Sequence, residues 1–138
     1  MSCPPADRSL DSLEPDAQER FEAFLRTLRR TFPQFRVIVT ETRRSAERQA
    51  CLRRTGASRA VRSNHQDGVA TDIALFRHAT GAIDWRPAVY RNVYRIVDPR
   101  DYGLTSGAHL WDWDEGHTQV VEAQGPGRDL GSTLESYD

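Results

Sequence analysis

Two short stretches of this sequence contain side chains that can bind a metal ion and act on a water molecule. His65 and Asp72 lie seven positions apart, and Asp114 and His117 lie three positions apart further along the chain. Two imidazoles and one carboxylate, from His65, Asp72 and His117, are a ligand set typical of a zinc ion that keeps one position open. Asp114 could then act as the general base that takes a proton from water. The pattern predicts a zinc site with hydrolytic chemistry.

These side chains can meet only if the backbone turns within each stretch. Side chains of a strand alternate between its two faces, so residues separated by an odd number of positions face opposite ways. A turn at Gly68 would place His65 on a loop and Asp72 on the strand that follows. A tight turn or bulge at Gly116 would do the same for the second stretch.

Two other acidic residues near Asp114 are alternative candidates for the general base. Glu115 differs from Asp114 in strand parity, and we expect both Asp112 and Glu115 to point elsewhere. A hydrolytic site also needs a positive group where charge develops on the carbonyl oxygen. Arg44 and Arg43, on the loop after the first expected strand, are candidates for this role.

Hydrophobic periodicity predicts the elements that must hold these residues. Helices are expected from Asp16 to Pro33, from Ser45 to Gly56 and over 87–97, and strands over 37–39, 68–76, 109–113 and 117–122. The strand over 68–76 places Asp72 between two alanines on one face, which leaves room for a ligand. No regular βαβ repeat is present, so the expected fold is α+β, with a small antiparallel sheet and flanking helices.

The 138 residues fit a single domain. We expect a flexible N-terminal arm over 1–14, a folded domain over 15–123 and a disordered tail over 124–138. Cys3 and Cys51 lack C-x-x-C spacing, and no disulfide is expected, in agreement with synthesis in a reducing compartment.

Charge and hydropathy restrict the possible partners. The net charge is −1, all 19 basic residues are arginines, and they are concentrated over 26–62. That segment is either a solvated helical face or a surface for an anionic polymer, and no nucleic-acid-binding motif accompanies it. No run of 18 apolar residues and no apolar N-terminal segment is present, so neither membrane insertion nor a signal peptide is expected.

Three segments resemble the motifs of a known peptidase family. That family comprises the zinc D-Ala-D-Ala carboxypeptidases and L-alanyl-D-glutamate endopeptidases, which share the hedgehog/DD-peptidase fold. Residues 63–72 resemble its S-x-H-x-x-G-x-A-x-D motif, residues 111–117 its W…D-x-x-H motif, and residues 42–49 its Y-R-S…Q segment. The resemblance covers residues 36–121. Departures at Arg43, Glu115, Gly116 and Thr118 leave the preferred peptide open.

The resemblance implies a role for each matching residue. It implies that His65, Asp72 and His117 bind Zn²⁺, that Asp114 is the base, and that Arg44 assists catalysis. The expected substrate-binding residues are Ser63, Arg43, Gln49, His109 and Trp111. Ser63 has an alternative role as a loop cap, and His109 could equally be structural.

The expected function is hydrolysis of peptidoglycan stem peptides, with L-alanyl-D-glutamate endopeptidase activity of the endolysin type. The alternatives are a D-Ala-D-Ala carboxypeptidase, a zinc-containing binding module without catalysis, and a nucleic-acid-binding domain that uses the arginine-rich segment. The presence of Asp114 argues against the binding module, because binding alone needs no base. We expect a monomer made in the cytoplasm that acts on the cell wall after release through a separate pore.

Overall fold

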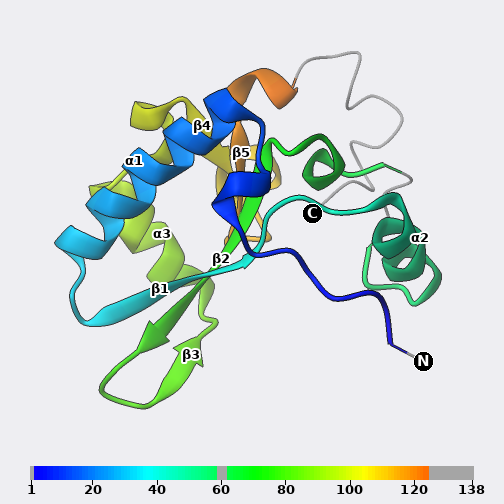
Figure 1. Cartoon of the computed structure of the whole chain (residues 1–138). Helices are drawn as coiled ribbons and strands as arrows, with labels where there is room; N and C mark the ends of the chain where they lie inside the picture. The colour runs from blue at the N-terminus through cyan, green and yellow to red at the C-terminus, as the bar shows by residue number, and fades with distance from the viewer. Residues whose placement is uncertain (1, 59–61, 125–138) are drawn as a thin grey trace.

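The computed structural model describes residues 2–58 and 62–124, which form a small α+β domain (Figure 1). The α-helices are α1 (Pro15–Thr31), α2 (Ala46–Arg54), α3 (Pro87–Ile96) and α4 (Gly107–Trp111). The strands are β1 (Phe35–Glu41), β2 (Ala70–Arg77), β3 (Ala82–Asp84), β4 (Leu104–Ser106) and β5 (His117–Val120). Short 3-10 helices include η1 (Leu10–Ser12), η2 (Asn64–Asp67) and η4 (Val121–Gln124). The expected fold class is confirmed.

The sheet is antiparallel, and its central strand carries a predicted metal ligand. The strand order is β1-β2-β5-β4, and β3 pairs with the C-terminal end of β2. Asp72 on β2 lies directly opposite His117 on β5. The register therefore joins the two sequence stretches that were expected to meet.

Helices α1 and α3 both contribute side chains to the core that supports this sheet. The predicted apolar stripe of α1 is buried, with Phe21, Phe24 and Leu28 fully covered. Tyr90 and Val93 of α3 join the same core, as do Leu75 of β2 and Leu104 of β4. The Leu75 amide donates a hydrogen bond to the Tyr90 hydroxyl at 3.2 Å, which connects α3 to the strand that carries Asp72. None of the helices that the structure describes has the length and apolar character needed to cross a bilayer.

The expected strand over 109–113 is wrong. Residues 107–111 form helix α4, because the Ser106 hydroxyl accepts a hydrogen bond from the His109 amide and caps that helix. Asp112 ends the helix with a positive φ of 66°. On the side away from β2, β5 pairs with the short strand β4 and not with residues 109–113.

The expectation that the cysteines stay unpaired is also wrong, because Cys3 and Cys51 form a disulfide. It joins the N-terminal segment, described from residue 2 and expected to be a flexible arm, to helix α2. Hydrogen bonds hold the segment at further points, among them Thr42 N–H to the Asp7 carbonyl at 2.7 Å. Residues 125–138 of the expected disordered tail lie outside the described residues.

Candidate metal centre

Three predicted ligands converge on one point of the sheet. Ligand atoms of His65, Asp72 and His117 all lie within 4.8 Å of one another. Nε2 of His65 lies 3.2 Å and Nδ1 of His117 lies 3.1 Å from the same carboxylate oxygen, Oδ1 of Asp72. Both imidazoles are buried, whereas the side chain of Asp72 is 24% exposed. The three donors therefore face a common point that is accessible from the side of Asp72.

His65 is positioned by the tight η2 turn, as the sequence predicted. The Ser63 side chain accepts a hydrogen bond from the His65 amide, and Gln66 completes a capping box with Ser63. Gly68 ends the turn with a φ of 71°, a left-handed conformation that favours glycine. Nδ1 of His65 donates to the Thr42 carbonyl at 2.7 Å, so Nε2 is the nitrogen available to a metal.

His117 has an equivalent partner on its other nitrogen. Its Nε2–H donates to Oε1 of Gln119 at 2.8 Å, and Nδ1 remains directed at Asp72. Oε1 of Gln119 also accepts a hydrogen bond from Nδ2 of Asn64 at 3.0 Å. This pair of bonds fixes the side-chain amide of Gln119 and connects the η2 turn to strand β5. Hydrogen-bond partners of this kind orient metal-binding histidines and select their tautomer.

The turn before His117 is built differently from the prediction. The positive φ values belong to Asp112 and Asp114, at 66° and 57°, and not to Gly116. Gly116 is needed for space instead, because a Cβ atom there would lie 2.6 Å from the Ile73 carbonyl oxygen. The expected turn is present and places His117 at the first position of β5.

The charges at this point favour a cation. Burial alone would raise the pKa of Asp72, but His65 and His117 hold that pKa well below its usual range. Burial alone would lower the pKa of His117, but hydrogen bonding to Asp72 and the charge of that carboxylate raise the pKa to about 9. The half-buried carboxylate of Asp72 therefore stabilises positive charge between the three side chains.

The donor set fits a zinc ion. Two imidazoles and one carboxylate are a recurrent ligand set of catalytic zinc, and such sites leave a further position for water or substrate. The fit extends to the partners of the ligands, because Thr42 and Gln119 each hold the second nitrogen of one histidine. These residues thus have the ligand types of a mononuclear zinc site, and a hydrogen bond orients each imidazole.

Asp114 lies beside this cluster. It lines a cavity of about 290 Å³ together with Asp72, Trp85 and Tyr90. Its carboxylate is close enough to His117 to contribute to the raised pKa of that imidazole. Asp114 and the predicted ligand Asp72 therefore line the same cavity.

The two alternative bases have another partner. Arg91 forms ion pairs with Asp112 at 3.0 Å and with Glu115 at 2.8 Å. Asp112 is exposed on the surface, whereas Glu115 also lines the cavity with Asp114. Glu115 therefore does not lie apart from Asp114 as the parity argument expected, and the role of Asp114 as the base stays a prediction.

Arg44 is a member of a buried polar network. Its guanidinium forms two hydrogen bonds with the Glu41 carboxylate, at 2.6 and 3.0 Å, and a third with Gln49 at 2.8 Å. Gln49 in turn donates to Ser58, and the Arg44 amide donates to the His65 carbonyl. In this arrangement Arg44 supports the loop next to His65, and its catalytic role stays a prediction.

The other predicted substrate-binding residues also have structural contacts. Ser63 caps the η2 turn, and Arg43 donates to the carbonyls of Ser12 and Gln66. The hydroxyl of Ser106 lies 2.9 Å from Nδ1 of His109, and the Trp111 ring centroid lies 5.6 Å from that of His117. Their contacts to substrate stay predictions, as does that of Gln49.

Three residues of the centre were not found from the sequence: Thr42, Asn64 and Gln119. A signal existed for Gln119, because residues two apart on a strand share a face and His117 begins that strand. No sequence signal marks Thr42, since its backbone carbonyl makes the contact. Asn64 precedes a predicted ligand, but its partner is 55 positions away.

Fold and site together define a small α+β domain in which His65, Asp72 and His117, a cluster that could hold a metal ion, meet on an antiparallel sheet. No family model matches the chain, and no curated protein matches its sequence. Among solved structures, the fold is similar to that of the Serratia marcescens L-Ala D-Glu endopeptidase ChiX, with a TM-score of 0.64. The two chains are 25% identical, and the match covers 83% of this chain and 85% of the other. This likeness supports, at the level of the peptidase family, the resemblance found in the motifs.

Proposed function

We propose that this protein is a zinc-dependent peptidase that hydrolyses peptidoglycan stem peptides, with L-alanyl-D-glutamate endopeptidase activity. One observation carries the proposal: His65, Asp72 and His117 converge within 4.8 Å in a fold similar to that of an L-Ala D-Glu endopeptidase. The partners of the two histidines add support, because they select the tautomers that metal binding needs.

His65 Nε2, His117 Nδ1 and the Asp72 carboxylate would hold the ion. When bound, zinc supplies a Lewis acid that polarises the substrate carbonyl and lowers the pKa of water toward about 7. The remaining chemistry belongs to the protein. The buried imidazoles exclude bulk water behind the site, and the partly exposed side of Asp72 leaves an approach for the peptide.

Asp114 would move the proton. Its carboxylate, in the cavity that Asp72 also lines, would accept a proton from the attacking water and return it to the leaving amine. General acid–base catalysis of this kind contributes about 10²- to 10⁴-fold in rate. Arg44 would assist at the carbonyl oxygen only if its guanidinium left Glu41, so we assign it first to the support of the His65 loop.

We propose further that the protein acts on the cell wall, outside the compartment in which it is made. The disulfide between Cys3 and Cys51 supports this proposal, because disulfides persist in oxidising surroundings.

Mass spectrometry of purified peptidoglycan digested by the zinc-loaded protein tests the proposed activity. Fragments with a new N-terminal D-glutamate or D-isoglutamine would identify the endopeptidase, whereas release of free D-alanine would identify the carboxypeptidase instead. Asp114→Asn should retain zinc and lose about 10²- to 10⁴-fold in cleavage rate. Full activity in that variant would overturn the assignment of the base, and intact peptidoglycan after digestion by the wild type would overturn the proposed function.

A further inference from the structure

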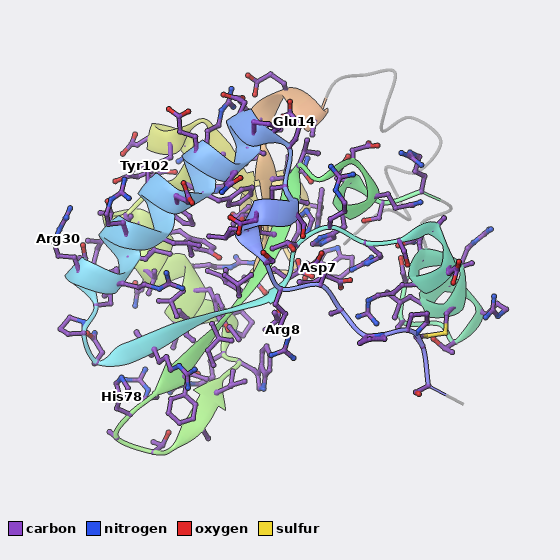
Figure 2. The ribbon with its side chains drawn as sticks, viewed as in Figure 1. Asp7, Arg8, Glu14, Arg30, His78 and Tyr102 are labelled. Carbon is purple, nitrogen blue, oxygen red and sulfur yellow. A yellow bond between two sulfur atoms is a disulfide. The ribbon has the colours of Figure 1, made fainter. Side chains whose placement is uncertain are left out.

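The N-terminal segment crosses the part of the molecule that holds His65. We call residues 3–14 the N-terminal strap. Figure 2 shows it running from the disulfide at helix α2, past Asp7, to Glu14 at the start of α1. Its only regular element is the short η1 turn. Its position therefore depends on the contacts that it makes with other parts of the chain.

The N-terminal end of the strap is attached to helix α2. Cys3 is bonded to Cys51, and Nη1 of Arg48 donates to the Pro4 carbonyl at 2.7 Å. Arg48 also pairs with Glu41, at 2.6 Å, in the buried network beside the site. The disulfide is the covalent part of this attachment.

The middle of the strap holds the hydrogen-bond partner of a metal ligand. The Asp7 carbonyl accepts a hydrogen bond from the Thr42 amide at 2.7 Å and from the Thr42 hydroxyl at 3.1 Å. The carbonyl of the same threonine accepts the hydrogen bond from Nδ1 of His65 at 2.7 Å. Thr42 thus lies between the strap and the imidazole, and a shift of the strap would move the group that orients His65.

The last part of the strap holds the turn that carries His65. Arg43 donates to the Ser12 carbonyl at 2.7 Å and to the Gln66 carbonyl at 3.2 Å. The Glu14 amide donates to the Gly68 carbonyl at 3.0 Å. The strap therefore contacts the His65 turn at its end as well as through Thr42.

We propose that the strap is the positioning element of His65 and that the Cys3–Cys51 disulfide makes the metal centre sensitive to redox state. A dithiol reductant would supply two electrons and two protons, cleave the S–S bond into two thiols and become a disulfide itself. The strap then loses its covalent attachment to α2, and the Asp7 carbonyl no longer holds Thr42 in a fixed position. Because Thr42 orients His65, the centre then binds zinc less tightly. This inference rests on the proposed zinc centre and predicts a wall hydrolase that is fully assembled only on an oxidising side.

Zinc affinity measured by competition with a chromophoric chelator tests the redox part. A phosphine reductant is suitable, because it cleaves the disulfide with water as the proton source, becomes a phosphine oxide and leaves no dithiol to bind zinc. We expect reduction of the wild type to weaken zinc binding by about tenfold, the scale of losing a partner of a metal-bound histidine. Equal affinities of the oxidised and reduced wild type would overturn the proposal.

The double variant Cys3→Ser/Cys51→Ser is the matched control. It should have the weakened affinity without any reductant and show no response to it. The control also excludes zinc binding by the freed thiols themselves. A variant with wild-type affinity would contradict the role of the disulfide.

Thr42 offers a second test that does not depend on the metal. Thr42→Val removes the hydroxyl that donates to Asp7, whereas Thr42→Ser retains it. Nitrogen NMR of the zinc-free protein should show the Nδ1–H tautomer of His65 in the wild type and in Thr42→Ser. A mixture of tautomers is expected in Thr42→Val and in the reduced wild type. An unchanged His65 signal in all four samples would overturn the strap as a positioning element.

These outcomes separate the inference from the proposed function. If zinc affinity responds to reduction but peptidoglycan stays intact, the strap is supported and the proposed substrate is wrong. If no form binds zinc, the metal centre is wrong, and the His65 signal alone decides the positioning role.

Discussion

Gln119 offers a direct measure of how far a neighbouring side chain tunes this centre. Its Oε1 accepts hydrogen bonds from His117 Nε2 at 2.8 Å and from Asn64 Nδ2 at 3.0 Å, and the side chain is buried. Gln119→Leu retains a similar volume but removes the acceptor of both bonds. The buried Nε2–H of His117, left without this acceptor, costs about 1–3 kcal/mol, so the free energy of unfolding should fall by about that amount.

The effect on the metal should be separate from the effect on stability. Loss of the partner of a metal-bound histidine weakens metal binding by about 10- to 100-fold, or about 1.4–2.7 kcal/mol at 25 °C. Zinc affinity is measured by chelator competition, and stability by urea unfolding of the zinc-free protein. Gln119→Glu keeps an acceptor and should bind zinc at least as tightly as the wild type. Asn64→Ala should lower stability but leave the bond to His117 in place.

The reasoning would be refuted by either of two results. One is a Gln119→Leu protein that folds and binds zinc with wild-type affinity. The other is a loss of zinc affinity in Gln119→Glu as large as that in Gln119→Leu, because the acceptor would then be irrelevant.

Three further predictions follow from the same geometry. Gly116→Ala would force a Cβ to within 2.6 Å of the Ile73 carbonyl, so we expect a loss of about 1–3 kcal/mol in urea unfolding, and an unchanged midpoint would contradict this. Burial alone would raise the pKa of Glu41, but Arg44 and Arg48 lower it below its usual value. Glu41 should therefore stabilise the fold above its unfolded pKa of about 4.3, and this contribution should be lost as pH falls through the lowered pKa. Thermal unfolding of Glu41→Gln should show a smaller acid-dependent loss than the wild type, and equal pH profiles would contradict the assignment. Removal of zinc with a chelator should cost about 2.7 kcal/mol relative to protein held at 100 times the dissociation constant of zinc, and calorimetry that finds no shift would exclude a bound ion.

The metal ligands could be predicted from the sequence because their constraints are local. The η2 turn needs a cap at Ser63 and a left-handed residue at Gly68, and both lie within a few residues of His65. The alternation of side chains along β2 then fixes the face of the sheet on which Asp72 lies. Spacing suggested the ligand set because each step involves a turn or a strand that short-range rules describe, and the resemblance to the family motifs supported it.

The parts that were missed depend on contacts between distant segments. Cys3 and Cys51 are 48 positions apart, and no local pattern indicates that the first residues return to α2. Residues 109–113 alternate in a way that suggests a strand, but the Ser106 cap makes a short helix that ends at Asp112. A short apolar segment can form either a strand or one helical turn, and the surrounding fold decides which.

The zinc content of the purified protein, determined by elemental mass spectrometry, tests the central claim most directly. The account predicts one zinc ion per chain at neutral pH in the wild type, retained in Asp114→Asn and lost in His117→Ala. A wild-type protein without zinc after dialysis against the metal, or a His117→Ala variant that still binds one ion, would contradict it.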